Sequence, residues 1–263
     1  VVDGLFVSNF VGKTPFAAIN LIMPILIILG ALGFMIGTGG SAIVAKTLGE
    51  GDPARANRYF SMLVYTTVVG GAVLAAAGEL SLPIVSELLG AEGAMLQDCI
   101  LYGRIILAAL PAFMLQNVFQ SFMITAEKSR LGLAVTVAAG LTNMVLDFVF
   151  IVPLGWGLAG AAIATAISQV IGGAVPIVYF ARKNDSLLRL TKAKFEGRIL
   201  LRTCTNGSSE LMSNISASIV TMLYNFQLMR LAGEDGIAAY GVVMYVNFVF
   251  SAIFIGYSIG AGA

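Results

Sequence analysis

Apolar residues run through this chain in long continuous stretches that short polar segments interrupt. Each stretch is about 20 residues long, enough for a helix to cross a hydrocarbon layer of roughly 30 Å. The pattern predicts about eight membrane-spanning helices. These are a partial first helix ending near Val11, followed by 16–38, 59–80, 99–124, 131–152, 157–181, 199–230 and 237–263. We therefore expect an all-α polytopic membrane protein.

The composition strengthens this expectation. Hydrophobic residues make up 58% of the 263 residues and charged residues only 11%, whereas a soluble domain carries about 25% charged residues. The mean hydropathy is +0.92. So little charge cannot cover the surface of a soluble protein.

The residue types that are missing or rare narrow the function. There is no histidine, and Cys99 and Cys204 are the only cysteines, which counts against most hydrolytic enzymes and against thiolate metal clusters. A net charge of +1 does not favour a nucleic-acid partner. The GEGD segment at 49–52 matches a pattern of intramembrane aspartyl proteases, but it lies in a polar turn outside the spans. We expect a transporter that is not an enzyme and holds no cofactor.

Lysine and arginine are unevenly distributed between the two sides of the membrane. If the spans alternate in direction, all of the 15 basic residues except Lys13, Arg104 and Arg230 fall on one side. This positive-inside bias predicts that the basic loops are cytoplasmic. We expect a multi-pass protein of the plasma membrane, such as a prokaryotic inner membrane, with the bilayer as its surroundings. The basic segment 182–198 would then be cytoplasmic, either solvated or in contact with anionic lipid.

An internal repeat suggests how the spans are grouped. Residues 16–42 align with residues 237–263, which lie 221 positions further on, and the second copy comes six spans after the first. Such a parallel repeat predicts two lobes with about twelve helices in total. We expect a six-helix lobe at 1–181, a linker at 182–198, and the first two helices of a second lobe at 199–263. Because the chain starts without methionine inside an apolar stretch, we interpret it as an internal piece of a longer protein.

Polar residues inside the spans are the candidate functional residues. Asp3, Asn143, Asp147 and Thr165 lie on three predicted helices, and at about 1.5 Å per residue they reach a similar depth. Buried carboxylates are costly in a membrane and mark ion or substrate paths by default. Two carboxylates, an amide and a hydroxyl suit Na⁺ or H⁺. A hydrogen-bond network that pairs the helices is the alternative.

A second group of polar residues inside a predicted span comes later in the sequence. Glu210 and Asn214 fall in the seventh predicted span, with several serines around them. They could bind a cationic substrate or relay protons. A structural hydrogen bond would explain them equally well.

Several motifs together resemble the multidrug and toxic compound extrusion (MATE) family. The resemblance covers essentially the whole chain. It rests on D-G-L-F-V-S-N-F-V-G-K-T from Asp3, M-P at 23–24, G-T-G-G-S-A at 37–42, L-G-E-G-D at 48–52, N-M-V-L-D at 143–147 and G-W-G-L-A-G-A-A-I-A-T at 155–165.

This resemblance implies a twelve-helix secondary transporter that exports organic cations in exchange for Na⁺ or H⁺, with no required protein partner. The cation site of the family's first lobe would fall on Asp3, Asn143, Asp147 and Thr165, the residues that depth selects. Glu210 lies in a helix where some members use a glutamate. A related flippase for lipid-linked or polysaccharide precursors is the alternative, but such a protein would favour a cavity lined with Arg and Lys.

Overall fold

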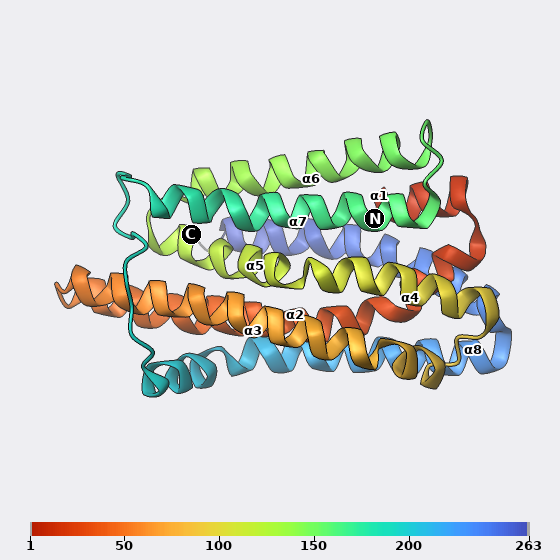
Figure 1. Cartoon of the computed structure of the whole chain (residues 1–263), viewed down its shortest axis with the longest axis horizontal. Coiled ribbons are helices and arrows are strands. Elements are labelled where there is room, and N and C mark those ends of the chain that lie inside the picture. The colour runs from red at the N-terminus through yellow and green to blue at the C-terminus, as the bar shows by residue number, and fades with distance from the viewer. Residues whose placement is uncertain (1, 262–263) are drawn as a thin grey trace.

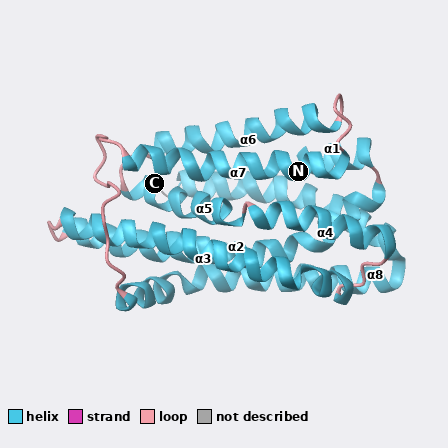
Figure 2. Ribbon diagram, viewed as in Figure 1, coloured by secondary structure: helices cyan, strands magenta, loops and turns pink. Residues whose placement is uncertain are grey.

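The computed structural model describes residues 2–261, with side-chain surroundings for 2–251, 253 and 254. Every regular element in this part of the chain is a helix, which confirms the all-α prediction (Figure 2). The elements are α1 (Val2–Phe6), the π-helix η1 (Val7–Val11), α2 (Lys13–Gly49), α3 (Pro53–Leu88), α4 (Gly93–Ala108), α5 (Leu110–Thr125), α6 (Ser129–Ile151), α7 (Gly157–Ala181) and α8 (Gly197–Ala261). Residues 262–263, which end the second repeat copy, lie outside the described residues.

The helices lie side by side and their loops gather at two ends of the bundle (Figure 1). The turns at 50–52 and 126–128 and the segment 182–196 are at one end. The turns at 89–92 and 152–156 are at the other end, together with the bend of α8. The polypeptide therefore crosses the bundle in alternating directions, as the assignment of basic loops to one side requires.

Four helices, α2, α3, α6 and α7, are long and apolar enough to cross a membrane, and α4 with α5 forms a fifth candidate. The 37 residues of α2 extend over about 55 Å, well beyond the predicted span of 16–38. The last turns of α2 pack beside the start of α3, and the turn between these two helices projects past the other helices (Figure 1).

The predicted span 99–124 is not one continuous helix but a bent pair of helices, which together can still form one span. α4 and α5 meet at Ala109 with a bend of 54°. Pro111 stands in the first turn of α5. Proline lacks a backbone N–H and its ring crowds the preceding turn, which favours a break of the helix at this point.

The predicted spans 199–230 and 237–263 are connected by a sharp bend within helix α8 and not by a loop. Both belong to α8, which turns back at Gly233, where φ is 59° and ψ is −148°. A positive φ of this kind favours glycine. The two limbs of α8 lie antiparallel (Figure 1), and Tyr224 stacks on Tyr240 across them at 5.5 Å.

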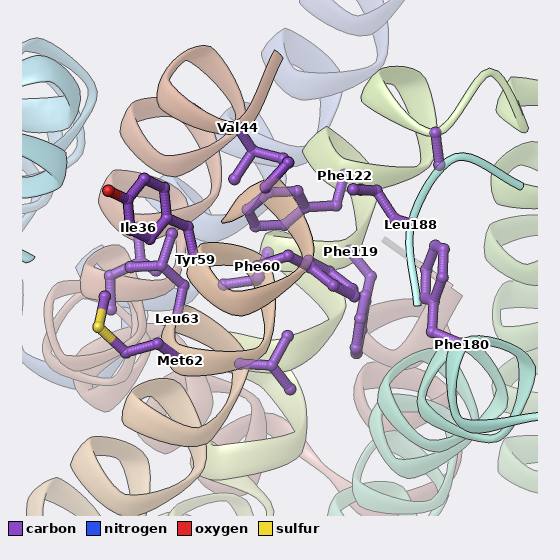
Figure 3. Close-up of a cluster of buried hydrophobic side chains, with 14 of the residues drawn as sticks. Ile36, Val44, Tyr59, Phe60, Met62, Leu63, Phe119, Phe122, Phe180 and Leu188 are labelled. Atoms are coloured by element: carbon purple, nitrogen blue, oxygen red, sulfur yellow. The ribbon is translucent and has the colours of Figure 1, made fainter. Parts of the chain in front are cut away.

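An aromatic cluster fills the core toward the end where the basic loops lie (Figure 3). The ring of Phe60 in α3 lies 4.9 Å from Phe122 in α5 and 5.0 Å from Phe180 in α7. All three side chains are fully buried. Edge-on aromatic contacts of this kind add to the area that they bury, so the cluster holds these three helices together.

The basic linker packs against the bundle. Leu188 is fully buried beside the aromatic cluster (Figure 3). The backbone N–H of Thr191 donates to Ser61 Oγ at 2.8 Å, and that of Arg189 donates to Asn57 Oδ1 at 2.7 Å. The linker is therefore anchored on α3, although its basic side chains are mostly exposed. The division of the chain into lobes remains a prediction.

Helix α8 crosses α2 with almost no space between the two backbones. A Cβ added to Gly207 would overlap the carbonyl of Met35, and one added to Gly39 would overlap the carbonyl of Thr203. Small residues permit such close helix contacts in membrane proteins. This crossing joins the two parts of the chain that the repeat assigns to different lobes.

Candidate functional site

Polar side chains from three helices meet inside the bundle. Thr165 of α7 donates from its hydroxyl to Asp3 Oδ2 of α1 at 2.8 Å. Asn143 of α6 lies next to the same hydroxyl, with 3.4 Å between Nδ2 and Oγ1. The helices thus place an amide, a hydroxyl and a carboxylate in one hydrogen-bonded row.

Asp147 completes this group. It lies one helical turn after Asn143 and has no exposed surface. The carboxyl of Asp3 is within hydrogen-bonding reach of it, and within the described part of the chain neither oxygen of Asp147 accepts a hydrogen bond from a donor. Two carboxyl groups can share a hydrogen bond only if one carries a proton, and if both are ionised their repulsion calls for a cation.

The ligand chemistry follows from these four residues. Carboxylate, hydroxyl and amide oxygens are the donors that hard cations prefer. Asn143 can offer Oδ1 because its Nδ2 faces Thr165. Among the described residues, no three His, Cys, Asp or Glu side chains come together. The arrangement can hold a proton or a hard monovalent cation between Asp3 and Asp147.

Two tyrosines that the sequence analysis did not select border this group. Tyr102 of α4 is 1% exposed, and its hydroxyl lies beside Thr165. Tyr245 of α8 packs against Gly4, next to Asp3. Depth counted along the predicted span 99–124 would have missed Tyr102, because that span begins only three residues before it. In the structure, α4 begins at Gly93 and Tyr102 lies about ten residues into the helix.

Glu210 and Asn214 lie apart from this group, on the first limb of α8. Asn214 Nδ2 donates to the Glu210 carbonyl at 2.9 Å and reaches Glu210 Oε1 at 3.5 Å. Glu210 is exposed. Asn214, in contrast, lines a cavity between α2 and α8.

This cavity has a volume of 460 Å³, within the range of small-molecule sites. Its lining residues are Asn20, Met23, Pro24, Ile27, Asn214, Ala217, Ser218, Thr221, Asn225, Tyr240, Gly241, Met244, Tyr245 and Phe248. The described lining is thus uncharged, with amides and hydroxyls among apolar and aromatic side chains. Because Tyr245 also packs beside Asp3, it forms a wall common to the cavity and the carboxylate group.

A proline explains one side of the cavity. Pro24 has no N–H to donate to the carbonyl of Asn20, four residues earlier. Asn225 of α8 replaces that donor, with a bond of 2.8 Å from Nδ2 to the Asn20 oxygen. The bond fixes the orientation of the buried Asn225 amide and links α8 to the proline-containing turn of α2.

Comparison with known proteins places these features in a family. Residues 1–149 match the family profile described as MatE. This segment carries Asp3, Asn143 and Asp147 but ends before Thr165.

Relatives and solved structures agree with this match. The chain is 25% identical over 240 residues to the multidrug export protein MepA of Staphylococcus saprophyticus, and 27% identical over 250 residues to that of Staphylococcus haemolyticus. These alignments cover 90% and 92% of the chain but 53% and 54% of the relatives, so the chain spans about half their length. An inward-facing multidrug resistance MATE family transporter of the MOP superfamily superposes with a TM-score of 0.89 at 24% identity, over 94% of this chain and 57% of that one.

Proposed function

Because the chain belongs to the MatE family, we propose that its protein exports small organic cations across the plasma membrane in exchange for Na⁺ or H⁺. Asp3, Asn143, Asp147 and Thr165 would bind the coupling ion. The carrying observation is the fully buried Asp147 carboxyl beside a second carboxylate, with no donor to its oxygens in the described part of the chain. Such a pair is stable only with a proton or a cation between its members.

Coupling requires that the ion prefer one conformation over another. Asp3 lies on α1, while Asn143 and Thr165 lie on α6 and α7. A bound ion would hold α1 against these two helices, and its release would leave the carboxylates to repel each other. A movement of α1 would then displace Tyr245, which packs against Gly4 and lines the cavity.

The cavity between α2 and α8 would contribute one wall of the substrate site. Its aromatic and methionine side chains suit flat organic cations. An anionic lipid-linked precursor would need basic partners, and none of the described residues that line the cavity is basic. This favours the exporter over the flippase. We propose no protein partner.

The test is the substitution Asp147→Asn in the full-length protein. It preserves shape and an amide oxygen but removes the charge that binds the ion. We expect normal expression and folding, with efflux of ethidium from proteoliposomes no longer driven by a Na⁺ or pH gradient. Exposed Asp185→Asn, in the linker, is the matched control and should transport normally. Gradient-driven efflux that survives Asp147→Asn would refute the assignment.

Imposing the two gradients separately identifies the ion. A response to Na⁺ alone indicates Na⁺ coupling, and a response to pH alone indicates proton coupling. If neither gradient drives efflux in the unmodified protein, the exporter proposal itself fails.

A further inference from the structure

A second cavity opens at the end of the bundle where the basic loops lie. It has a volume of 630 Å³ and lies where α2, α3 and the start of α8 meet. Three cations line it, one from each helix: Lys46, Arg55 and Arg202. Neither the carboxylate group nor the substrate cavity includes any of these residues.

The positive charge of this cavity is only partly balanced. Glu50 is the one acidic residue among the described lining, and it lies 4.0 Å from Lys46 with both side chains more than half exposed. An exposed pair at this distance attracts weakly. Asp52 lies nearby, but its carboxylate caps α3 by accepting from the Arg55 backbone N–H at 2.9 Å. Arg202 forms no ion pair with any residue that the structure describes.

The donors are also arranged to face a common ligand. Arg55 donates from Nε to the Tyr59 hydroxyl at 2.6 Å and lies 5.3 Å from the centre of that ring. This contact positions the guanidinium while leaving its two terminal nitrogens available. Arg202 and Asn206 come one turn apart from the facing helix, and both line the cavity. Guanidinium groups match the oxygens of a phosphate, and lysine adds a point charge.

The surroundings indicate where the phosphate would come from. The excess of basic loops assigns this end to the cytoplasmic side, where the leaflet carries anionic lipids. Ile43 and Ile199 add apolar surface to the lining, which a glycerol or acyl group could contact. Basic pockets between membrane helices on this side bind lipid headgroups in other proteins.

We propose that this cavity binds the phosphate headgroup of an anionic lipid from the cytoplasmic leaflet. The phosphate is held by Arg55 and Arg202, with Lys46 as a third positive charge. Because these residues come from α2, α3 and α8, the lipid bridges the two predicted lobes where the linker joins them. The site is separate from ion coupling and from drug binding, so it does not depend on the proposed function.

The experiment measures thermal unfolding of the purified, delipidated full-length protein in detergent, with three added probes. These are dioleoyl phosphatidylglycerol, dioleoyl phosphatidylcholine and soluble glycerol 3-phosphate. A ligand that binds only the folded state raises the unfolding midpoint. We expect phosphatidylglycerol to raise the midpoint saturably, phosphatidylcholine to have no effect, and added salt to weaken the shift. Stabilisation by glycerol 3-phosphate as strong as that by the lipid would assign the site to free phosphate compounds and overturn the lipid proposal.

Two substitutions locate the effect. Arg202→Gln should weaken the apparent affinity for phosphatidylglycerol about tenfold, which corresponds to about 1.4 kcal/mol. Arg58→Gln is the matched control, because Arg58 is exposed on α3 but does not line the cavity, and it should change the affinity less than twofold. Equal losses in both variants would indicate diffuse attraction to the basic surface and overturn the site.

The proposal stays testable if Arg202→Gln fails to fold. Arg202→Lys keeps the charge but loses the planar fork, and should bind with an intermediate affinity. The comparison of phosphatidylglycerol with phosphatidylcholine needs no variant at all. Equal stabilisation of the unmodified protein by these two lipids would refute recognition of the phosphate charge.

Discussion

Thr14 donates a hydrogen bond of 2.8 Å to Glu234 Oε2, joining the start of α2 to the bend of α8. Beside it, the ammonium of Lys13 pairs with Asp235, and this hydrogen bond raises the pKa of Lys13. These contacts lie at the end of the bundle opposite the basic loops (Figure 1). They hold together two segments that the repeat assigns to different lobes.

Thr14→Val should loosen this contact. The substitution keeps the side-chain shape but leaves Glu234 without its hydroxyl donor, and hydrogen bonds to charged groups are worth about 1.5–3 kcal/mol. We expect the unfolding midpoint to fall, and a cysteine cross-link between residues 13 and 235 to form more slowly. Thr142→Val is the control, because the Thr142 hydroxyl bonds only to the Ala138 carbonyl of its own helix. Equal midpoints for the two variants would contradict the prediction.

Asp98 gives a pH dependence of defined sign. Burial, followed by the nearby Glu234 charge, raises the pKa of this carboxyl. The folded protein therefore binds the proton more tightly than the unfolded chain, so ionised Asp98 costs stability above its folded pKa. That cost disappears as the pH falls below the unfolded value.

Asp98→Asn should accordingly stabilise the protein at about pH 7, by less than about 1 kcal/mol because the group is partly solvated. The gain should vanish in acid. Unfolding midpoints measured across the pH range would show both effects, with the exposed Glu92→Gln as control. A variant less stable than the unmodified protein at neutral pH would reverse the sign and refute the argument.

Gly207→Ala should disrupt the crossing of α2 and α8. The added methyl group would meet the backbone carbonyl of Met35, which cannot rotate away as a side chain could, so we expect a loss of about 1–3 kcal/mol. Gly70→Ala is the control, because nothing lies within 4 Å of the position of its Cβ. That change should leave stability equal or raise it by about 0.5–1 kcal/mol. Unfolding in a denaturant series distinguishes the two variants.

Asn225→Leu should destabilise the proline-containing turn of α2. The carbonyl of Asn20 would lose its replacement donor, and a buried unpaired carbonyl costs about 1–3 kcal/mol. The double variant Asn225→Leu with Pro24→Ala restores a backbone N–H at residue 24 and should recover most of the loss. If the change in stability of the double variant equalled the sum of the changes in the two single variants, the Asn225 amide and Pro24 would not be coupled.

The sequence predicted the helices well because each apolar stretch must satisfy its backbone groups within the membrane. Depth counted from turn residues also selected Asp3, Asn143, Asp147 and Thr165, which the structure brings together. Their role in ion binding remains a prediction.

Contacts between distant helices were harder to predict. Asn225 pairs with Asn20 across 205 positions, and no periodicity in either helix indicates that partner. Pro111 is consistent with the break at Ala109, because proline disfavours the preceding turn of a helix. Prolines also lie inside α2, α3 and α7 without ending them, so the proline alone did not predict the break. Helices α2 and α3 continue beyond their predicted apolar spans because they pack against each other there. A hydropathy pattern cannot predict such packing.

The anchored linker restricts how far the start of α8 can travel. Thr191 is held on Ser61, and the backbone N–H of Glu196 donates to Met62 Sδ at 3.1 Å. Even if the second bond opened, the six Cα–Cα steps from Thr191 to Gly197 could extend only about 20 Å. The start of α8 is therefore tethered to α3 at the end of the bundle where the basic loops lie. A separation of the two predicted halves at the opposite end would instead have to break the contacts of Lys13 with Asp235 and of Thr14 with Glu234.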